Sequence, residues 1–303
     1  MRVSGLNNSN AMLAQLGVNG NRVAKLMEQL STQKRVNVPS DDPVAASRLV
    51  QLGREQAAIK QYQSNITSLS GKLSVQESHI TAMSNQVLAV SDKLKLANNS
   101  TLSEKDLAGY GAELESMLDS LVATMNSKNE NGSYLFSGTK TNTKAVELVD
   151  GKYVYGGNDN SRETIVANGV SITENTNVAH VFSGSGNDLE MLNKLKELSE
   201  KMQDPTLNFA DYQDDIAAMI DMNQSTSDNL GALLTDLGGR QNRLTLIDDA
   251  HTDVSLSNAE VETDLNAADS ATTTINLQLY MTSMQITNKA YSMVSQLNLF
   301  SML

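Results

Sequence analysis

Several residue types are missing or scarce in this chain of 303 residues. It has no cysteine, no tryptophan, three prolines and four phenylalanines. Without cysteine it cannot form a disulfide, a cysteine-ligated zinc site, an iron–sulfur cluster or a thiol nucleophile. With so few prolines, long helices can run without interruption. With aromatic residues at 4%, the core must be aliphatic, built from Leu, Ile, Val, Ala and some of the 14 Met.

Basic residues are also in short supply. Lys and Arg number 23 against 35 Asp and Glu, a net charge of −12. Binding to nucleic acid requires a basic surface, so we expect no nucleic-acid partner. The N-terminal segment lacks the apolar run of a cleaved signal peptide. The uncharged stretch 270–288 is rich in Thr, Ser, Asn and Gln, which predicts an amphipathic helix and no membrane insertion.

Apolar residues at three- and four-residue spacing dominate the chain and predict long helices with coiled-coil-like seams. Shorter stripes of this kind occur near residues 107–125 and 189–202, and longer ones near 216–261 and 275–297. A capping box, Ser103 with Asp106, is expected to open one of these helices. The strongest seam has only two polar members, Glu55 and Gln76; it comprises Leu52, Glu55, Ile59, Tyr62, Ile66, Leu69, Leu73, Gln76, Ile80, Met83, Val87, Val90, Leu94 and Ala97.

An earlier helical stripe, over residues 13–30, ends at a break that contains two of the three prolines. Pro39 forces the residue before it out of helical geometry. Asp41 or Asp42 is expected to cap the next helix, with Pro43 in its first turn. We therefore predict a domain-break hinge at Pro39, Asp41, Asp42 and Pro43.

The periodicity changes from helical to alternating between residues 136 and 184. Two short alternating pairs flank the turn dipeptides Asp150-Gly151 and Asn168-Gly169. Such dipeptides favour the tight turns of β-hairpins. This segment is therefore predicted to be a small β insertion with two hairpins.

The layout predicts a mainly α fold with a small β insertion, in which long coiled-coil-like helices are nested and the N- and C-terminal helices pair. Residues 1–60 carry eight basic and four acidic residues, whereas residues 241–303 carry two and seven, so the two ends attract each other. We expect a terminal helical domain (1–40 plus 264–303), a central helical bundle (41–135 plus 185–263) and an outer β domain (136–184).

Candidate catalytic and metal-binding groups are sparse. His79, His180 and His251 lack convincing partners at metal-ligand spacing, and His251 is expected on a solvated face. Capping accounts for the Asp41-Asp42 pair better than catalysis does. No active site, cofactor site or metal site is predicted.

Several motifs resemble the flagellin family, and the Pro39-Ser-Asp-Asp-Pro43 form resembles its hook–filament junction members more than its filament subunits. One departure is Gln33, where the family commonly carries Gly. The matching motifs lie at residues 29–36, 39–46, 61–66, 132–139 and 297–303.

This resemblance implies a flagellin-like layout and a structural, non-enzymatic subunit of the extracellular flagellum. Its partners would be other copies of itself, the other hook-associated junction protein and flagellin. It also implies export through the flagellar type III channel as an unfolded chain, without a cleaved signal peptide, after a chaperone binds the C-terminal region.

The terminal helices offer a physical route to assembly. Short amphipathic helices are marginal alone, because nucleation is costly and one face stays wet. We therefore expect the tails to be loose in the monomer and to order on neighbouring copies. The predicted interface comprises Leu13, Leu16, Val23, Leu30, Ile275, Leu279, Ile286, Met293, Leu297 and Phe300.

Three other interpretations stay open at the level of sequence. A filament flagellin would share the layout but be made in great excess. A cytoplasmic coiled-coil adaptor would have stably folded ends. An enzyme housed in the β insertion would need convergent polar side chains, and the sequence offers no obvious set.

Overall fold

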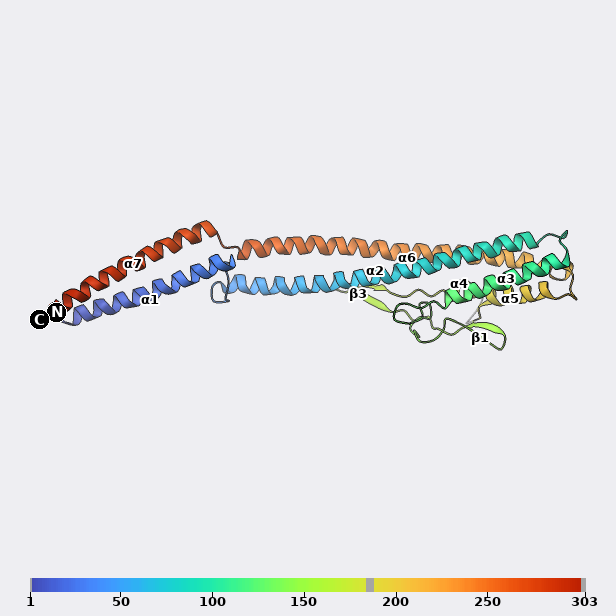
Figure 1. Cartoon of the computed structure of the whole chain (residues 1–303), viewed down its shortest axis with the longest axis horizontal. Coiled ribbons are helices and arrows are strands. Elements are labelled where there is room, and N and C mark those ends of the chain that lie inside the picture. The colour runs from blue at the N-terminus through green and yellow to red at the C-terminus, as the bar shows by residue number, and fades with distance from the viewer. Residues whose placement is uncertain (1, 184–187, 301–303) are drawn as a thin grey trace. The chain divides into compact units, whose positions relative to one another are not determined.

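The computed structural model describes the backbone of residues 2–183 and 188–300, and the side chains of residues 9–183 and 188–294. One region of short strands lies between two groups of helices. The predicted mainly α fold with a small β insertion is confirmed (Figure 1). The helices are α1 (Arg2–Thr32), α2 (Pro43–Ala97), α3 (Glu104–Met125), α4 (Ala179–Phe182), α5 (Glu190–Gln203), α6 (Phe209–Asn266) and α7 (Ser270–Phe300).

The chain divides into two compact units. Unit 1 comprises residues 1–59 and 252–303, and unit 2 comprises residues 60–251. The three-domain division expected from the sequence, with boundaries near 40, 135, 185 and 264, stays a prediction.

Helix α2 follows the predicted seam closely. All fourteen seam positions are buried except Glu55, which is exposed, and Tyr62, which is half-buried. The row Leu52, Ile59, Ile66, Leu73, Ile80, Val87 and Leu94 repeats every seven residues, which keeps one narrow face of a long helix turned towards its neighbours.

Helices α3 and α5 complete the core of unit 2. The capping box at the start of α3 forms as predicted, with the Asp106 amide donating to Ser103 Oγ at 3.2 Å. The two helices approach each other closely at Gly111, where an added Cβ would lie 3.0 Å from the Ser199 carbonyl oxygen. Burial of α3 and α5 leucines against α2 holds these elements together.

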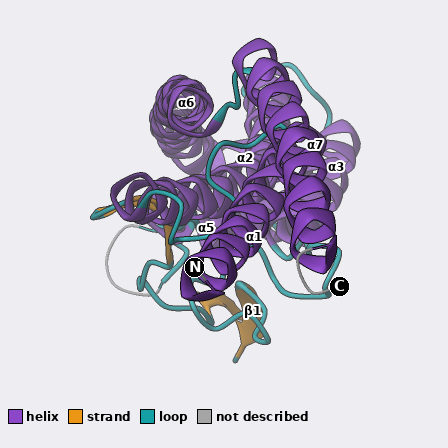
Figure 2. Ribbon diagram, turned by 90° about the vertical axis from the view of Figure 1, so that its left-hand side faces the viewer, coloured by secondary structure: helices purple, strands orange, loops and turns teal. Residues whose placement is uncertain are grey.

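Both predicted hairpins form, and their strands are orange in Figure 2. Strands β1 (Val146–Val149) and β2 (Lys152–Tyr155) pair antiparallel through the Asp150-Gly151 turn. Strands β3 (Glu163–Ala167) and β4 (Val170–Thr173) pair likewise, with an irregularity between Ile165 and Ala167.

Side chains of the long helices hold the second hairpin at this irregularity. Asn65 Nδ2 donates to the Ile165 carbonyl at 2.8 Å, and His251 Nε2 lies 2.7 Å from the Val166 carbonyl oxygen. The His251 ring also stacks on Tyr62, with ring centres 5.5 Å apart. The expectation of a solvated face for His251 was therefore wrong, because the ring is half-buried between three elements.

Tyr155 anchors the first hairpin. Its hydroxyl donates to the Phe136 carbonyl at 2.9 Å, and the ring is buried. Burial raises the pKa of Tyr155 to about 12, so the hydroxyl stays a donor at physiological pH.

Candidate assembly interface on the terminal helices

Helices α1 and α7 lie side by side in unit 1 and run antiparallel (Figure 1). Asn19 Nδ2 donates to Ser283 Oγ at 3.3 Å, and Arg22 donates to the Tyr280 hydroxyl at 3.2 Å. The side of α1 towards α7 follows three–four spacing and is half-buried, except at the fully buried Asn19. It comprises Met12, Leu16, Asn19, Val23, Leu26 and Leu30.

The side of α7 that is shielded by this pairing is mixed in character. Its buried and half-buried positions are Thr273, Asn276, Leu277, Tyr280, Ser283, Met284, Thr287, Ala290, Tyr291 and Val294. No apolar side chain within residues 9–32 and 270–294 is fully buried, so the seam realises only part of the gain from burying apolar surface. The α1–α7 pair is therefore a weakly stabilised element.

A second apolar row of α7 points away from α1. We call Ile275, Leu279, Ile286 and Met293 the α7 outer row; these side chains are 67%, 63%, 64% and 51% exposed, respectively. The last three repeat every seven residues, so they form a straight line along the helix. Each such side chain is worth about 1.5–3 kcal/mol when fully buried, and more than half of its surface stays in water in the single chain.

The predicted interface residues fall into three groups. Leu13 and the α7 outer row are exposed, whereas Leu16, Val23 and Leu30 are half-buried on the side of α1 that meets α7. The side chains of Leu297 and Phe300 lie outside the described residues. Contact of any of these residues with a neighbouring copy stays a prediction.

Hydrogen bonds join the two segments that connect the terminal helices to α2 and α6. We call residues 33–42 and 265–269 the connector clasp. The Arg35 amide donates to the Asn266 carbonyl at 2.6 Å, and the Ala268 amide donates to the Gln33 carbonyl at 3.1 Å. The buried Asn266 side chain also accepts from the Val36 amide at 3.0 Å. A short antiparallel bridge between the connectors results.

Two aspartates fix the turn within the clasp. Asp42 Oδ1 accepts from the Ala45 amide at 3.0 Å, so Asp42 is the N-cap of α2 and Pro43 is its first helical residue. Asp41 accepts from the Asn37 and Val38 amides at 3.0 and 3.1 Å. Of the two residues expected to provide the cap, Asp41 and Asp42, it is thus Asp42 that does so.

Ion pairs join the same two aspartates to basic residues that precede them in the chain. Lys25 Nζ lies 2.7 Å from Asp41, and Arg35 Nη1 lies 3.0 Å from Asp42. The Lys25 hydrogen bond is the main cause of the lowered pKa of Asp41. The Ala45 amide and then Arg35 lower the pKa of Asp42. The turn with Pro39 lies where the hinge was predicted, and hinge motion there stays a prediction.

Gln33 has a left-handed backbone, with φ of 57°, directly after α1 ends at Thr32. This is the position after a helix where glycine is favoured, because a Cβ is strained there. The structure thus gives a physical reason why glycine suits this site and why Gln33 is a departure.

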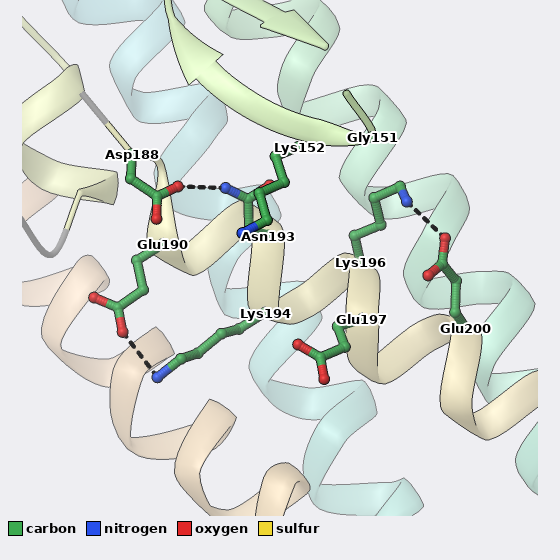
Figure 3. A pocket seen from close by; sticks show the side chains of 9 residues that line it. All are labelled: Gly151, Lys152, Asp188, Glu190, Asn193, Lys194, Lys196, Glu197 and Glu200. Atoms are coloured by element: carbon green, nitrogen blue, oxygen red, sulfur yellow. Dashed lines mark hydrogen bonds and ion pairs between the residues drawn. The ribbon is translucent and has the colours of Figure 1, made fainter. Parts of the chain in front are cut away.

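The depression drawn in Figure 3 lies in unit 2 and is surrounded by charge. Its volume is about 530 Å³, and α5 supplies much of its lining. Glu190 pairs with Lys194 at 2.8 Å and Lys196 with Glu200 at 2.6 Å, while Asp188 accepts from Asn193 at 2.6 Å. These carboxylates and ammonium groups neutralise one another, which is typical of a solvated, salt-bridged surface.

Among the residues that the structure describes, no helix is both long and apolar enough to span a membrane. No group of three or more His, Asp or Glu side chains there is arranged to hold a metal ion.

Comparison with known proteins agrees with the helical layout. Residues 3–141 match the family described as bacterial flagellin N-terminal helical region. The chain is 30% identical over 291 residues to flagellar hook-associated protein 3 of Escherichia coli strain K12, covering 92% of each chain. It is 27% identical over 314 residues to the protein of the same name from Salmonella typhimurium, covering 99% of this chain and 96% of that one.

A solved structure agrees as well. One named as a flagellar hook-associated protein from Vibrio parahaemolyticus is 36% identical, with a TM-score of 0.69, and covers 75% of this chain and 100% of its own. Identity at this level over nearly the whole chain, together with the shared helical architecture, identifies the relationship. This chain belongs to the flagellar hook-associated protein 3 family.

Proposed function

We propose that this chain is a structural subunit of the bacterial flagellum, joins hook to filament, and assembles through its terminal helices. Membership of the hook-associated protein 3 family supports the flagellar role. The observation that carries the assembly mechanism is the α7 outer row, four large apolar side chains that α1 leaves exposed.

The mechanism follows from the difference between the two faces of α7. In one copy the mixed face of α7 meets α1, and the α7 outer row meets water. When copies meet, the outer row is buried against neighbouring helices, and the gain of about 1.5–3 kcal/mol per side chain offsets the entropy of ordering the tails. Assembly is thus coupled to the ordering of α1 and α7.

The proposed partners are other copies of this chain, the other hook-associated junction protein and flagellin. Delivery would be through the flagellar type III export channel as an unfolded chain, with an export chaperone covering the C-terminal region. A chain without cysteine suits this route, because no disulfide can form before it reaches its destination. The role requires no catalytic step.

A fluorescently labelled copy tests the proposed location. It should mark a single spot where hook meets filament. Label along the whole filament would indicate a filament subunit instead, and label confined to the cytosol would contradict a flagellar role.

Substitution of the outer row tests the proposed mechanism. The double variant Leu279→Asn, Ile286→Asn should fold its unit 2 normally but be incorporated into flagella at least tenfold less than the unchanged chain. The matched control is Thr282→Asn, which replaces an exposed polar residue of the same helix and should leave incorporation unchanged. Equal incorporation of both variants would contradict assembly through this row.

A truncation addresses the end of the chain. Removal of residues 294–303 should leave the melting of unit 2 unchanged and abolish swimming and incorporation. Normal swimming by a strain that carries only the truncated chain would contradict the terminal-helix mechanism.

A further inference from the structure

A wide groove lies on the outward side of the first turns of α2. Its volume is about 610 Å³, and its lining includes Pro43, Ala46, Val50 and Arg54. These positions lie on the side of α2 away from the buried Ala45 and Leu52. The small side chains let another helix approach closely, as in tightly packed helix pairs.

The groove is basic. Arg54 is the one charged side chain in its lining, and Arg48 beside it donates to the lining residue Gln51 at 3.0 Å. Neither arginine has an ion-pair partner in the described part of the chain. The groove therefore offers an apolar floor with unneutralised positive charge at its side.

An acidic face with the opposite character lies on the last turns of α6. Asp253, Leu256, Glu260 and Asp264 are three or four residues apart, so they share one side of the helix. All four are exposed, and Leu256 is 62% exposed. No carboxylate of this set forms an ion pair with a side chain of residues 9–183 or 188–294, and the sequence has no Lys or Arg from 244 to 288.

These two surfaces match in length and charge. The groove face runs from residue 43 to 54 and the acidic face from 253 to 264, each about 16 Å along its helix. Within one copy, α6 already meets α2 through other side chains, since Gln56 donates to Ser255. The exposed acidic face is therefore left for a different molecule.

We propose that the α2 groove of one copy receives the acidic α6 face of the next copy. This inference rests on the proposed structural role. Leu256 would lie on the apolar floor near Val50, and the acids beside it would meet Arg48 and Arg54. Because the two surfaces differ, the contact is head-to-tail, and its repetition joins many copies in a ring or a helical row.

Cysteine cross-linking tests this contact directly, because the native chain has no cysteine to interfere. A full-length variant with Val50→Cys and Leu256→Cys is expressed in cells that lack the native chain, and isolated flagella are mildly oxidised. We expect a ladder of disulfide-linked multimers. The control, Leu88→Cys with Leu256→Cys, uses another exposed α2 position and should stay monomeric.

The outcomes separate this inference from the proposed function. Flagella that contain the Val50→Cys, Leu256→Cys variant but yield monomers or only dimers would overturn the head-to-tail contact and leave the structural role intact. Absence of the unchanged, labelled chain from flagella would overturn the structural role itself.

Charge reversal provides a second measurement that does not depend on cross-linking. Arg54→Glu should lower incorporation at least tenfold, and adding Glu260→Arg in the same chain should restore at least half of it. Lys105→Glu, an exposed change in unit 2, is the control and should have no effect. Unchanged incorporation of Arg54→Glu, or loss that Glu260→Arg does not restore, would overturn the contact, provided the variants melt like the unchanged chain.

Discussion

Gln33 shows how one side chain limits the stability of unit 1. Its φ of 57° costs about 1 kcal/mol in a residue with a Cβ, whereas glycine adopts it freely. Gln33→Gly should therefore stabilise unit 1 by about 1 kcal/mol, measured as the shift of its unfolding transition in urea.

Ala24→Gly is the matched control for this change. Ala24 is an exposed residue inside α1, where glycine costs about 1 kcal/mol. A loss of stability in both variants would mean that the left-handed geometry of Gln33 is not present in solution.

The aspartates of the clasp give unit 1 a defined response to acid. The pKa values of Asp41 and Asp42 are held below their ordinary value of 3.8 by hydrogen bonds and by Lys25 and Arg35. Carboxylates of this kind stabilise the fold above about pH 4, and the stabilisation is lost as pH falls through the lowered pKa values. The protection of the clasp amides, measured as the exchange rate relative to the intrinsic rate at the same pH, should therefore fall as pH drops below about 4.

Asp42→Asn isolates this effect. Asparagine is also a good N-cap but does not titrate, so the variant should lose the Arg35 pair and show a smaller acid response in the same exchange measurement. An undiminished acid response would assign the effect to other carboxylates, such as Asp269 at the start of α7, whose pKa is also lowered.

Residue roles were predictable where the partners lie close in sequence. The cap at Asp42 and the box at Ser103 and Asp106 involve neighbours within three residues, and both form. The role of His251 was missed because its partners, Tyr62 and Val166, are brought to it only by the tertiary fold. No local pattern at His251 contains that information.

At the scale of elements, the α2 seam carries the stability of unit 2. Leu73 is fully buried, so Leu73→Asp places a carboxylate in the apolar seam and should unfold unit 2 at room temperature. Val75→Asp, two residues away on the exposed side of the same helix, should shift the melting temperature by only a few degrees. The check is thermal melting by circular dichroism, and equal melts would contradict the seam.

Helix α6 shows where apolar periodicity misleads. Its inward row repeats every seven residues through Leu230, Leu237, Leu244 and then His251 and Asn258. Because the last members are polar, sequence reasoning followed the nearby Val254 and Val261, which are exposed. The strict repeat was the better guide than residue type, since His251 is accommodated there by the Val166 carbonyl and the Tyr62 ring.

Asn19 holds a comparable position in the α1 seam. A buried polar residue in a helix pair costs stability but fixes alignment. Asn19→Leu should slow amide exchange in α1 and α7 of the monomer, while lowering incorporation into flagella, because the helices lose the Ser283 contact that sets their register.

Asn21→Leu, an exposed change in the same helix, should alter neither quantity. Equal exchange rates in Asn19→Leu and the unchanged chain would contradict a stability cost at Asn19, and unchanged incorporation would contradict its register role.

At the scale of the whole molecule, the weak α1–α7 seam predicts uneven stability in the free chain. Amides of α1 and α7 should exchange with solvent at least a hundredfold faster than those at the buried centre of α2, because the apolar side chains of this two-helix seam are only half-buried. Hydrogen exchange with mass spectrometry on the monomer measures this. Strong protection at both ends would contradict ordering on assembly.

The molecule's layout was more predictable than its assembly surface. Proline placement, turn dipeptides and helical stripes located the elements, because each of these features acts locally. The direction in which a stripe faces is a tertiary property. The stripes of α1 and α7 look alike in sequence, yet Leu16 and Val23 turn inward while Leu279 and Ile286 turn outward.

The connector clasp has a mechanical consequence. A single extended connector would let the terminal helices swivel about its backbone bonds, so twisting would be dissipated there. In this chain two connectors run alongside each other, joined by amide–carbonyl bonds and by the Arg35 guanidinium on the Leu265 carbonyl. Torque applied to α1 and α7 is then shared between two backbones, and the hydrogen bonds between the connectors resist their sliding past each other. This arrangement suits a coupling that must rotate without slipping.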